Sequence, residues 1–312
     1  MIETWLTRTL GIDLPILGAP MGGRAGGELA GAVSRAGGLG MLGAARYTTP
    51  EWIAAESAVV RDTGLPFGVG LMTWSLGESA QHAALLDAAI EAKPALISLS
   101  FGDPAPYVEK IHAAGVPVLS QINTIEDLRI VEAAGVDAVA AQGTEAGGHT
   151  GRIGTLPLLQ EVLEATNLPV LAAGGIGTGR GLAAVIAAGA EGAIVGTALL
   201  ASPETTGPDY ARDRLIAAGS ADTVYTSVFD QARNQPWPTR WGGRALTNAF
   251  TRKYHNSDAG HAMLSGAYDP ADPDLGVVYA GEAAGLVTES LPAAQVVERM
   301  AAQAEVLLRR FR

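Results

Sequence analysis

Short runs of apolar residues recur along the first two thirds of the chain, with very little polar alternation inside them. Each run has the length of a strand rather than that of a helix. Strands that are buried on both faces of a parallel sheet have this unbroken apolar character. The pattern therefore predicts eight buried strands, over residues 15–19, 39–42, 66–71, 95–99, 116–120, 137–141, 169–173 and 192–195.

Segments with helical character separate these strands, and most of them end at a glycine, which helix C-termini prefer. The phrases AAGVPVLSQ, AAGVDAVAAQ and AAGAEGAIVG repeat one order of helix end, glycine turn and apolar strand. Repeated strand–helix units of this number favour an α/β fold, the (β/α)8 TIM barrel, over a doubly wound open sheet. The predicted helices cover residues 26–36, 50–61, 104–114, 125–134 and 179–188.

The chain changes character after Ser202-Pro203. Residues 204–289 hold more Tyr, Trp, Arg, Asp and Pro, without regular strand–helix alternation, and we expect a mostly helical inserted lobe over the barrel mouth. Residues 291–311 have an amphipathic pattern at helical spacing and are expected to supply the eighth barrel helix. The predicted domains are a barrel of residues 1–203 plus 290–312 and a substrate lobe of residues 204–289.

The chain is acidic, with a formal net charge of −11 over 312 residues. Proteins that bind nucleic acid or anionic membranes draw much of their affinity from basic patches, so we expect neither partner. The absence of cysteine excludes disulfides, iron–sulfur clusters and a cysteine nucleophile. No secretory signal is recognisable in MIETWLTRTLGIDLP, and a cytoplasmic location is expected.

The segment QGTEAGGHTG, residues 142–151, follows the sixth predicted strand and combines a glycine-rich turn with His149. A glycine-rich backbone can approach a ligand closely, and a histidine can transfer a proton near neutral pH. Because the active site of a barrel lies at the carboxyl ends of its strands, His149 is the predicted catalytic residue. Glu145 is either a second acid–base group or a cap of the turn.

The other histidines lack this setting. His82 and His112 fall in helical segments and are expected to be solvated, whereas His255 and His261 lie in the lobe without a glycine-rich turn. No pair of histidines or carboxylates has the spacing of a metal site, so no metal is predicted.

Two glycine turns follow the seventh and eighth predicted strands, at Gly174-Gly175 and at Gly196-Thr197. In TIM barrels the loops after these two strands commonly bind a phosphate group through backbone N–H groups. The pair therefore predicts an anion site, which the negative net charge does not oppose because the donors are amides. GIGTGRG also matches part of a dinucleotide fingerprint, but such a match alone is weak.

Three stretches are similar to motifs of the nitronate monooxygenase family, formerly called 2-nitropropane dioxygenases: PILGAPMGG, AQGTEAGGHTGRIGTLPLL and LAAGGIGTGRGLAAVIAAGAEGAIVGTALLASPE. The resemblance continues in GGRALTNAF of the lobe and YAGEAAGLV before the last helix, so it covers nearly the whole chain. It implies an FMN-bound (β/α)8 barrel with a helical substrate lobe. His149 matches the active-site histidine of the family.

The same resemblance implies FMN contacts at the strand ends. Met21 and Gly22 would lie beside the isoalloxazine, Gln121 would face it from the fifth strand, and the phosphate would lie over the last two glycine turns. The implied FMN-binding set is Met21, Gly22, Gln121, Gln142, Gly147, Gly148, Gly174, Gly175, Gly196 and Thr197. One departure is Gly70: relatives often read PFGVN, with the asparagine touching the flavin, where this chain reads PFGVG.

The activity that the resemblance implies is oxidation of alkyl nitronates, such as propionate 3-nitronate, by O2 to a carbonyl compound and nitrite. The alternative is an FMN-dependent NAD(P)H:quinone or enoyl-acyl carrier protein reductase of the same superfamily. A non-redox phosphosugar lyase or isomerase is less favoured, since Lys93, Lys110 and Lys253 are the only lysines and none is expected at a strand end.

The lobe residues that shape the pocket stay open at the level of sequence. Trp241, Tyr254 and Tyr279 are candidate substrate contacts, although aromatic core packing explains each of them about as well. The expected partners are a small-molecule substrate and O2, and a homodimer is one candidate for the oligomeric state.

Overall fold

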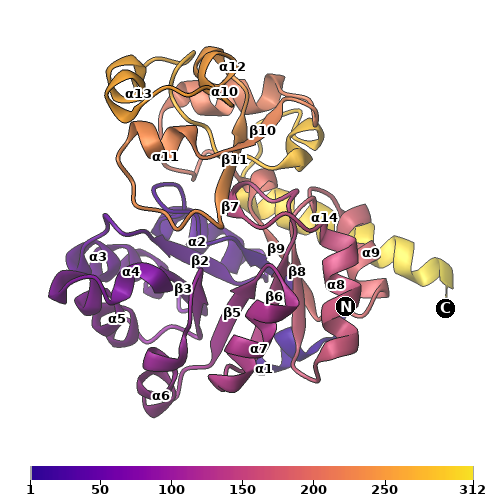
Figure 1. The fold of residues 1–312 in the computed structure, drawn as a ribbon. Coiled ribbons are helices and arrows are strands. Elements are labelled where there is room, and N and C mark those ends of the chain that lie inside the picture. The colour runs from indigo at the N-terminus through magenta and orange to yellow at the C-terminus, as the bar shows by residue number, and fades with distance from the viewer. Residues whose placement is uncertain (1, 312) are drawn as a thin grey trace.

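Eight parallel strands form a barrel in the computed structural model of the protein, which describes residues 2–311 (Figure 1). The strands are neighbours in the order β1-β9-β8-β6-β5-β4-β3-β2, and a bridge from Leu17 to Leu39 joins β1 to β2 and closes the barrel. The predicted TIM barrel is confirmed. Its strands are β1 (Ile16–Gly18), β2 (Gly40–Ala44), β3 (Phe67–Met72), β4 (Leu96–Ser100), β5 (Val118–Ile122), β6 (Ala138–Gln142), β8 (Val170–Ala173) and β9 (Gly192–Val195).

Most strands begin one or two residues after their predicted start, and proline accounts for several of these offsets. Pro15, Pro66, Pro117 and Pro169 stand directly before β1, β3, β5 and β8. Because proline has no N–H to donate to a strand ladder, the ladder begins at the next residue.

Helices surround the barrel, and each predicted helix is present within two residues at its start. The helix that ends the chain, α14 (Ala293–Leu308), packs against α9 and α2 and completes the ring as predicted. The five others that were predicted are α2 (Gly27–Arg35), α3 (Pro50–Arg61), α6 (Ala105–Ala113), α7 (Ile125–Ala133) and α9 (Gly179–Ala187). None of the helices within residues 2–311 is long and apolar enough to cross a membrane.

Three barrel helices were not predicted, α1 (Trp5–Leu10), α4 (Thr73–Leu76) and α8 (Thr155–Ala165), whereas α5 (Ala80–Glu91) forms the helical segment expected around His82. In α1, Leu6 and Leu10 pack with Leu17 and Leu39 in the apolar cluster that closes the lower end of the barrel. The expectation of a solvated His82 is wrong, since its side chain in α5 is only 12% exposed.

The lobe lies over the mouth of the barrel (Figure 1). Besides helices it contains two strands, and β11 pairs antiparallel with both β10 and β7 (Gly148–Thr150). The glycine segment of residues 142–151 thus includes a short strand that joins the barrel to the lobe. The elements of the lobe are α10 (Asp209–Ala217), β10 (Thr223–Thr226), α11 (Val228–Ala232), β11 (Gly242–Leu246), α12 (Ala249–Tyr254), α13 (His261–Ala267) and η2 (Glu282–Leu286).

The chain enters and leaves the lobe at neighbouring points. The Glu204 carboxylate accepts a hydrogen bond from Ala293 N at 3.2 Å, at the start of α14. Ser290 Oγ donates to Ala201 O at 2.7 Å. These contacts fix the lobe over the carboxyl ends of the strands.

Candidate active site

The turn after β8 offers unpaired backbone donors at the barrel mouth. Gly174 and Gly175 have φ angles of 107° and 70°, which favour glycine because a side chain there is strained. The N–H groups of residues 174–177 have no acceptor within residues 2–311. An added Cβ at Gly174 would lie 2.6 Å from Thr155 Oγ1. Such a run of free N–H groups just before a helix suits an anion.

Gly196 and Thr197 follow β9, the neighbour of β8 in the barrel. Thr197 Oγ1 accepts a hydrogen bond from Gly281 N at 2.9 Å, so its own proton stays available to a ligand. A Cβ at Gly196 would lie 3.5 Å from the Met21 sulfur, which places Met21 of the first strand end beside the last. The donor set of the two turns fits a phosphate group.

A chain of side-chain hydrogen bonds fixes the orientation of Gln142. Trp241 Nε1 donates to Asn123 Oδ1 at 3.1 Å, and Asn123 Nδ2 donates to Gln142 Oε1 at 3.0 Å. Gln121 Nε2 donates to the same oxygen at 2.8 Å. An indole N–H can only donate, so the Asn123 atom that it contacts must be the oxygen. Asn123 Nδ2 then donates to the Gln142 oxygen, and Gln142 Nε2 is left free to donate. The structure thus brings Gln121 and Gln142, two of the predicted site residues, together at the strand ends.

His149 lies in β7 and pairs with a buried carboxylate from the lobe. Its Nε2 is 2.9 Å from Asp230 Oδ2, and both side chains are less than a tenth exposed. Asp230 belongs to α11, so 81 residues separate the pair in sequence. Within residues 2–311, Nδ1 has no hydrogen-bond partner. A carboxylate on one ring nitrogen leaves the other free to meet a substrate, which suits an acid–base histidine.

Two further side chains donate hydrogen bonds to Asp230. Arg233 Nη2 and the Tyr279 hydroxyl donate to Asp230 Oδ1 at 3.2 and 3.0 Å, and Arg233 Nη2 lies 2.9 Å from the Tyr279 oxygen. Burial, and then the Asp230 charge, raise the pKa of Tyr279 well above its ordinary value. Burial by itself would lower the pKa of Arg233, but the effects of Tyr279 and Asp230 are larger and raise this pKa. Tyr279 therefore stays protonated, and Arg233 charged.

An aromatic layer covers one face of His149. The Trp237 ring is stacked on the imidazole, with 3.4 Å between centroids and 7° between planes. Trp237 in turn contacts Trp74 and Phe101, which follow β3 and β4, at 5.3 and 5.0 Å. The lobe segment before β11 thus shields the histidine from water on that face.

Glu145 acts as a structural cap. Its carboxylate accepts hydrogen bonds from Thr155 N and Thr155 Oγ1, both at 2.8 Å, at the start of α8. With both oxygens near the helix N-terminus, the turn-cap alternative holds.

The two glycines before His149 differ in their surroundings. Gly147 packs against the lobe backbone, because an added Cβ would lie 2.6 Å from Gly281 N. Gly148 has φ of 72° and open space around it. Gly148 is therefore the one that offers room for a ligand.

Pro20 occupies the space beside Gly70. A Cβ at Gly70 would clash with the Pro20 ring, so an asparagine has no room here unless Pro20 moves. Gly22 is exposed on the mouth, where an added Cβ would lie 2.7 Å from Ala45 Cβ. Met21 and Gly22 thus lie at the barrel mouth beside Pro20. In relatives with an asparagine at the position of Gly70, an amide side chain from the third strand would be there instead.

Of the three lobe aromatic residues that were candidate substrate contacts in the sequence, two belong to the site. Tyr279 joins the His149 cluster, and Trp241 orients Asn123, whereas Tyr254 packs against Phe250 in the lobe core. Four further residues belong to the site although no sequence pattern indicated them: Asn123, Asp230, Arg233 and Trp237. An acid and a base three residues apart on a short helix are too common to single out Asp230.

A phosphate-type cradle and a buried histidine–carboxylate pair at the mouth of a (β/α)8 barrel define a barrel enzyme that holds an anionic cofactor or substrate. The model of the nitronate monooxygenase family matches residues 3–303, and the chain belongs to this family of flavin-dependent oxidoreductases. The resemblance seen in the motifs is confirmed.

Relatives with different named activities are about equally similar. The nitronate monooxygenase of Paraburkholderia phytofirmans is 32% identical, and the match covers 97% of this chain and 96% of that protein. A (3aS,4S,5R,7aS)-5-hydroxy-7a-methyl-1-oxo-octahydro-1H-indene-4-carboxyl-CoA dehydrogenase of Rhodococcus jostii is 36% identical, but the match covers 73% of this chain and 64% of that protein.

Solved structures agree on the fold. FabK from Thermotoga maritima superposes with a TM-score of 0.87 at 31% identity, covering 100% of this chain and 99% of that one. A nitroalkane oxidase from Streptomyces ansochromogenes gives a TM-score of 0.83 at 33% identity, covering 98% and 99%. These similarities establish the oxidoreductase family but not the substrate.

Proposed function

We propose that the protein uses FMN to oxidise alkyl nitronates with O2. In balanced form, two nitronate ions and one O2 yield two carbonyl compounds and two nitrite ions. The observation that carries the proposal is His149, whose Nδ1 is free at the barrel mouth while Asp230 holds Nε2. Relatives named nitronate monooxygenase over nearly the full chain support this choice.

The amides of residues 174–177 and the Thr197 hydroxyl would hold the FMN phosphate. Gln142 Nε2 would donate to the flavin ring, with Gln121 and Asn123 keeping it in place. Bound FMN would supply the electron transfer that links the nitronate to O2. The role of the protein is to position the two reactants.

His149 would bind the nitronate through Nδ1. The nitronate carries its charge on two oxygens, so a protonated Nδ1 donates a hydrogen bond to one of them. If a neutral nitroalkane binds instead, unprotonated Nδ1 is the base that removes the proton next to the nitro group. Asp230 fixes the ring, and Trp237 excludes water from one face.

An NAD(P)H-dependent reductase is the second candidate function. The similarity of this chain to a dehydrogenase and to FabK supports it as the alternative. Anaerobic mixing of the FMN-loaded protein with one donor at a time separates the two. We expect a nitronate to bleach the flavin absorbance rapidly, with nitrite released on return of O2. Bleaching by NADH or NADPH but not by nitronate would replace the proposal with the reductase.

The proposed partners are thus a small-molecule substrate and O2. A homodimer remains a proposal that sedimentation of the FMN-loaded protein tests directly.

A further inference from the structure

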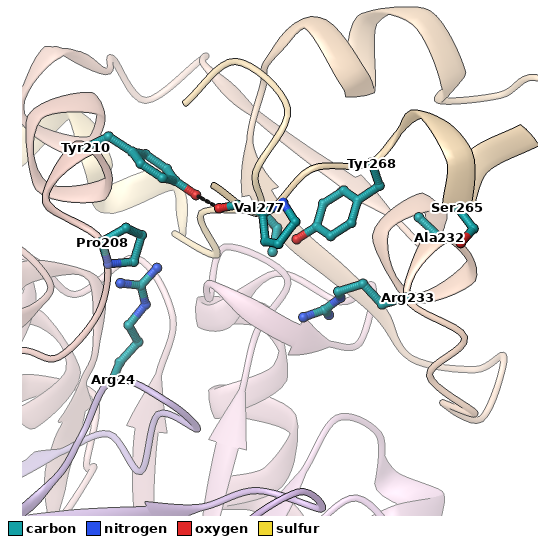
Figure 2. Close-up of a pocket in the computed structure, with 9 residues that line it drawn as sticks. Arg24, Pro208, Tyr210, Ala232, Arg233, Ser265, Tyr268 and Val277 are labelled. Carbon is teal, nitrogen blue, oxygen red and sulfur yellow. Dashed lines mark hydrogen bonds between the residues drawn. The ribbon is translucent and has the colours of Figure 1, made fainter. Parts of the chain in front are cut away.

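A cavity of about 540 Å³ lies between the first strand-to-helix loop of the barrel and the lobe (Figure 2). Its charged lining residues are Arg24 and Arg233, with no carboxylate among them. That is unexpected in a chain with 32 acidic and 21 basic residues. Figure 2 shows the two guanidinium groups on opposite sides, with the Tyr268 hydroxyl directed into the space between them.

Arg24 lacks an acidic partner. Its Nη1 donates to Thr206 O at 3.1 Å, and no carboxylate within residues 2–311 lies within ion-pair distance of it. Burial lowers the pKa of Arg24, as expected for a cation withdrawn from water without a counter-charge. Gly207, with φ of 130°, leaves room for the guanidinium, because any Cβ there would clash with Nη1. The backbone is thus shaped to hold this arginine in place.

The hydroxyls of the cavity complete a set of donors. Tyr210 donates to Pro270 O at 2.7 Å, and its oxygen lines the cavity. Within residues 2–311, the Tyr268 hydroxyl has no hydrogen-bond partner and can donate to a ligand. Two guanidinium groups and a phenol suit carboxylate or phosphate oxygens, which accept several charge-assisted hydrogen bonds.

The cavity borders the His149 cluster, because Arg233 lines the cavity and also donates to Asp230. On its other side, Arg24 directly follows the Met21-Gly22-Gly23 strand end. A ligand bound between Arg24 and Arg233 is therefore next to the residues that surround the proposed reaction centre. A volume of about 540 Å³ greatly exceeds what a short nitroalkane fills.

We propose that this cavity binds a carboxylate or phosphate group at the far end of an extended substrate, with Arg24 as its main anchor. This inference rests on the proposed oxidation and narrows its substrate class. The preferred substrates are then long-chain nitronates that carry a second, terminal anionic group, and nitronates of equal length without that group bind less well.

The test compares three nitronates of matched length on the FMN-loaded enzyme, prepared by deprotonation of 1-nitrohexane, 6-nitrohexanoate and 6-nitrohexyl phosphate. We expect kcat/KM for one of the two nitronates with a terminal anion to exceed that of the 1-nitrohexane nitronate about tenfold or more. The better anion identifies the terminal group. Equal values for all three would overturn the inference yet leave the oxidation standing, whereas no nitrite from any of them would overturn the oxidation itself.

Arg24→Gln should reduce the ratio of kcat/KM between the nitronate with the better terminal anion and the 1-nitrohexane nitronate about ten- to hundredfold, the range for a hydrogen bond to a charged group. The matched control is Arg299→Gln, which removes the same charge from an exposed surface pair with Glu289. It should keep the wild-type ratio. An unchanged ratio in Arg24→Gln would contradict the assignment.

A binding measurement makes the inference independent of turnover. Pyrophosphate and glutarate, titrated calorimetrically into the wild-type FMN-loaded enzyme, should give at least one saturable site. Tyr268→Phe, which removes one donor, should weaken that site about three- to tenfold even if Arg24→Gln fails to fold. Absence of binding by both anions would overturn the proposal.

Discussion

The glycine turns after β8 and β9 and the polar cluster around His149 share one barrel mouth but are assembled differently. The turns are local: Gly174 and Gly175 act through backbone conformation within a few residues of each other. The cluster joins β7 to α11 and to Tyr279, across 81 residues or more. A motif can thus specify an anion cradle, whereas a paired histidine depends on how the lobe is placed.

The greatest difference between the two regions should come from His149→Asn. It removes the acid–base nitrogen but no part of the cradle, so turnover of nitronate should fall about 10²–10⁴-fold while FMN stays bound. Nitrite release and flavin absorbance measure the two effects separately. Loss of the flavin along with the activity would mean that the two regions are not separable.

Asp230→Asn should affect stability as well as activity. It removes the carboxylate that accepts from His149, Arg233 and Tyr279, and should lower the free energy of unfolding by about 1.5–3 kcal/mol. Denaturant unfolding of the FMN-loaded protein measures it. Glu289→Gln, the control, breaks an exposed pair with Arg299 and should cost below about 1 kcal/mol. Equal losses in both would show that Asp230 does not organise the cluster.

Gly175→Val tests the cradle. A β-branched residue strains the left-handed backbone and displaces an N–H, so the FMN dissociation constant should rise about ten- to hundredfold. Gly115→Val is the matched control, since Gly115 has φ of 75° at the end of α6, away from the mouth. The control should lose stability yet keep its flavin affinity. A similar loss of FMN affinity in both variants would show that Gly175 affects flavin binding only through the general stability of the protein.

Gly70→Asn asks whether the barrel rim can accept the asparagine common in relatives. The side chain must displace Pro20, so we expect a loss of about 1–3 kcal/mol in unfolding free energy and no tighter FMN binding. Gly266→Asn, in open space on α13, should be nearly neutral. Tighter FMN binding in Gly70→Asn would show that Pro20 yields easily.

Tyr279 gives the cluster a pH signature. Its pKa is raised in the folded protein, so above pH 10 the unfolded chain loses this proton while the folded one keeps it. The contribution of Tyr279 to the free energy of unfolding is therefore fully present below pH 10 and decreases above it, by about 1.4 kcal/mol per pH unit. Melting temperatures from pH 9 to 11 should fall less steeply for Tyr279→Phe than for wild type. Parallel slopes would contradict a buried neutral phenol.

Much of the barrel could be predicted because its information is local. Unbroken apolar runs specify strands buried on both faces, and a proline before β1, β3, β5 and β8 moves each start by one or two residues. The bounds of α5 were not predicted because no glycine turn marks its end. The short strands β7, β10 and β11 were missed because their glycines and threonines give no apolar signal.

The sequence by itself determined the barrel, the glycine turns and His149 as the candidate acid–base residue, since each depends on neighbours in the chain. Only the tertiary structure decided that Asp230 holds that histidine, that Glu145 caps a helix, and that Arg24 faces a cavity. Side-chain partners are chosen by the packing of the lobe on the barrel, and no spacing in the chain encodes that packing.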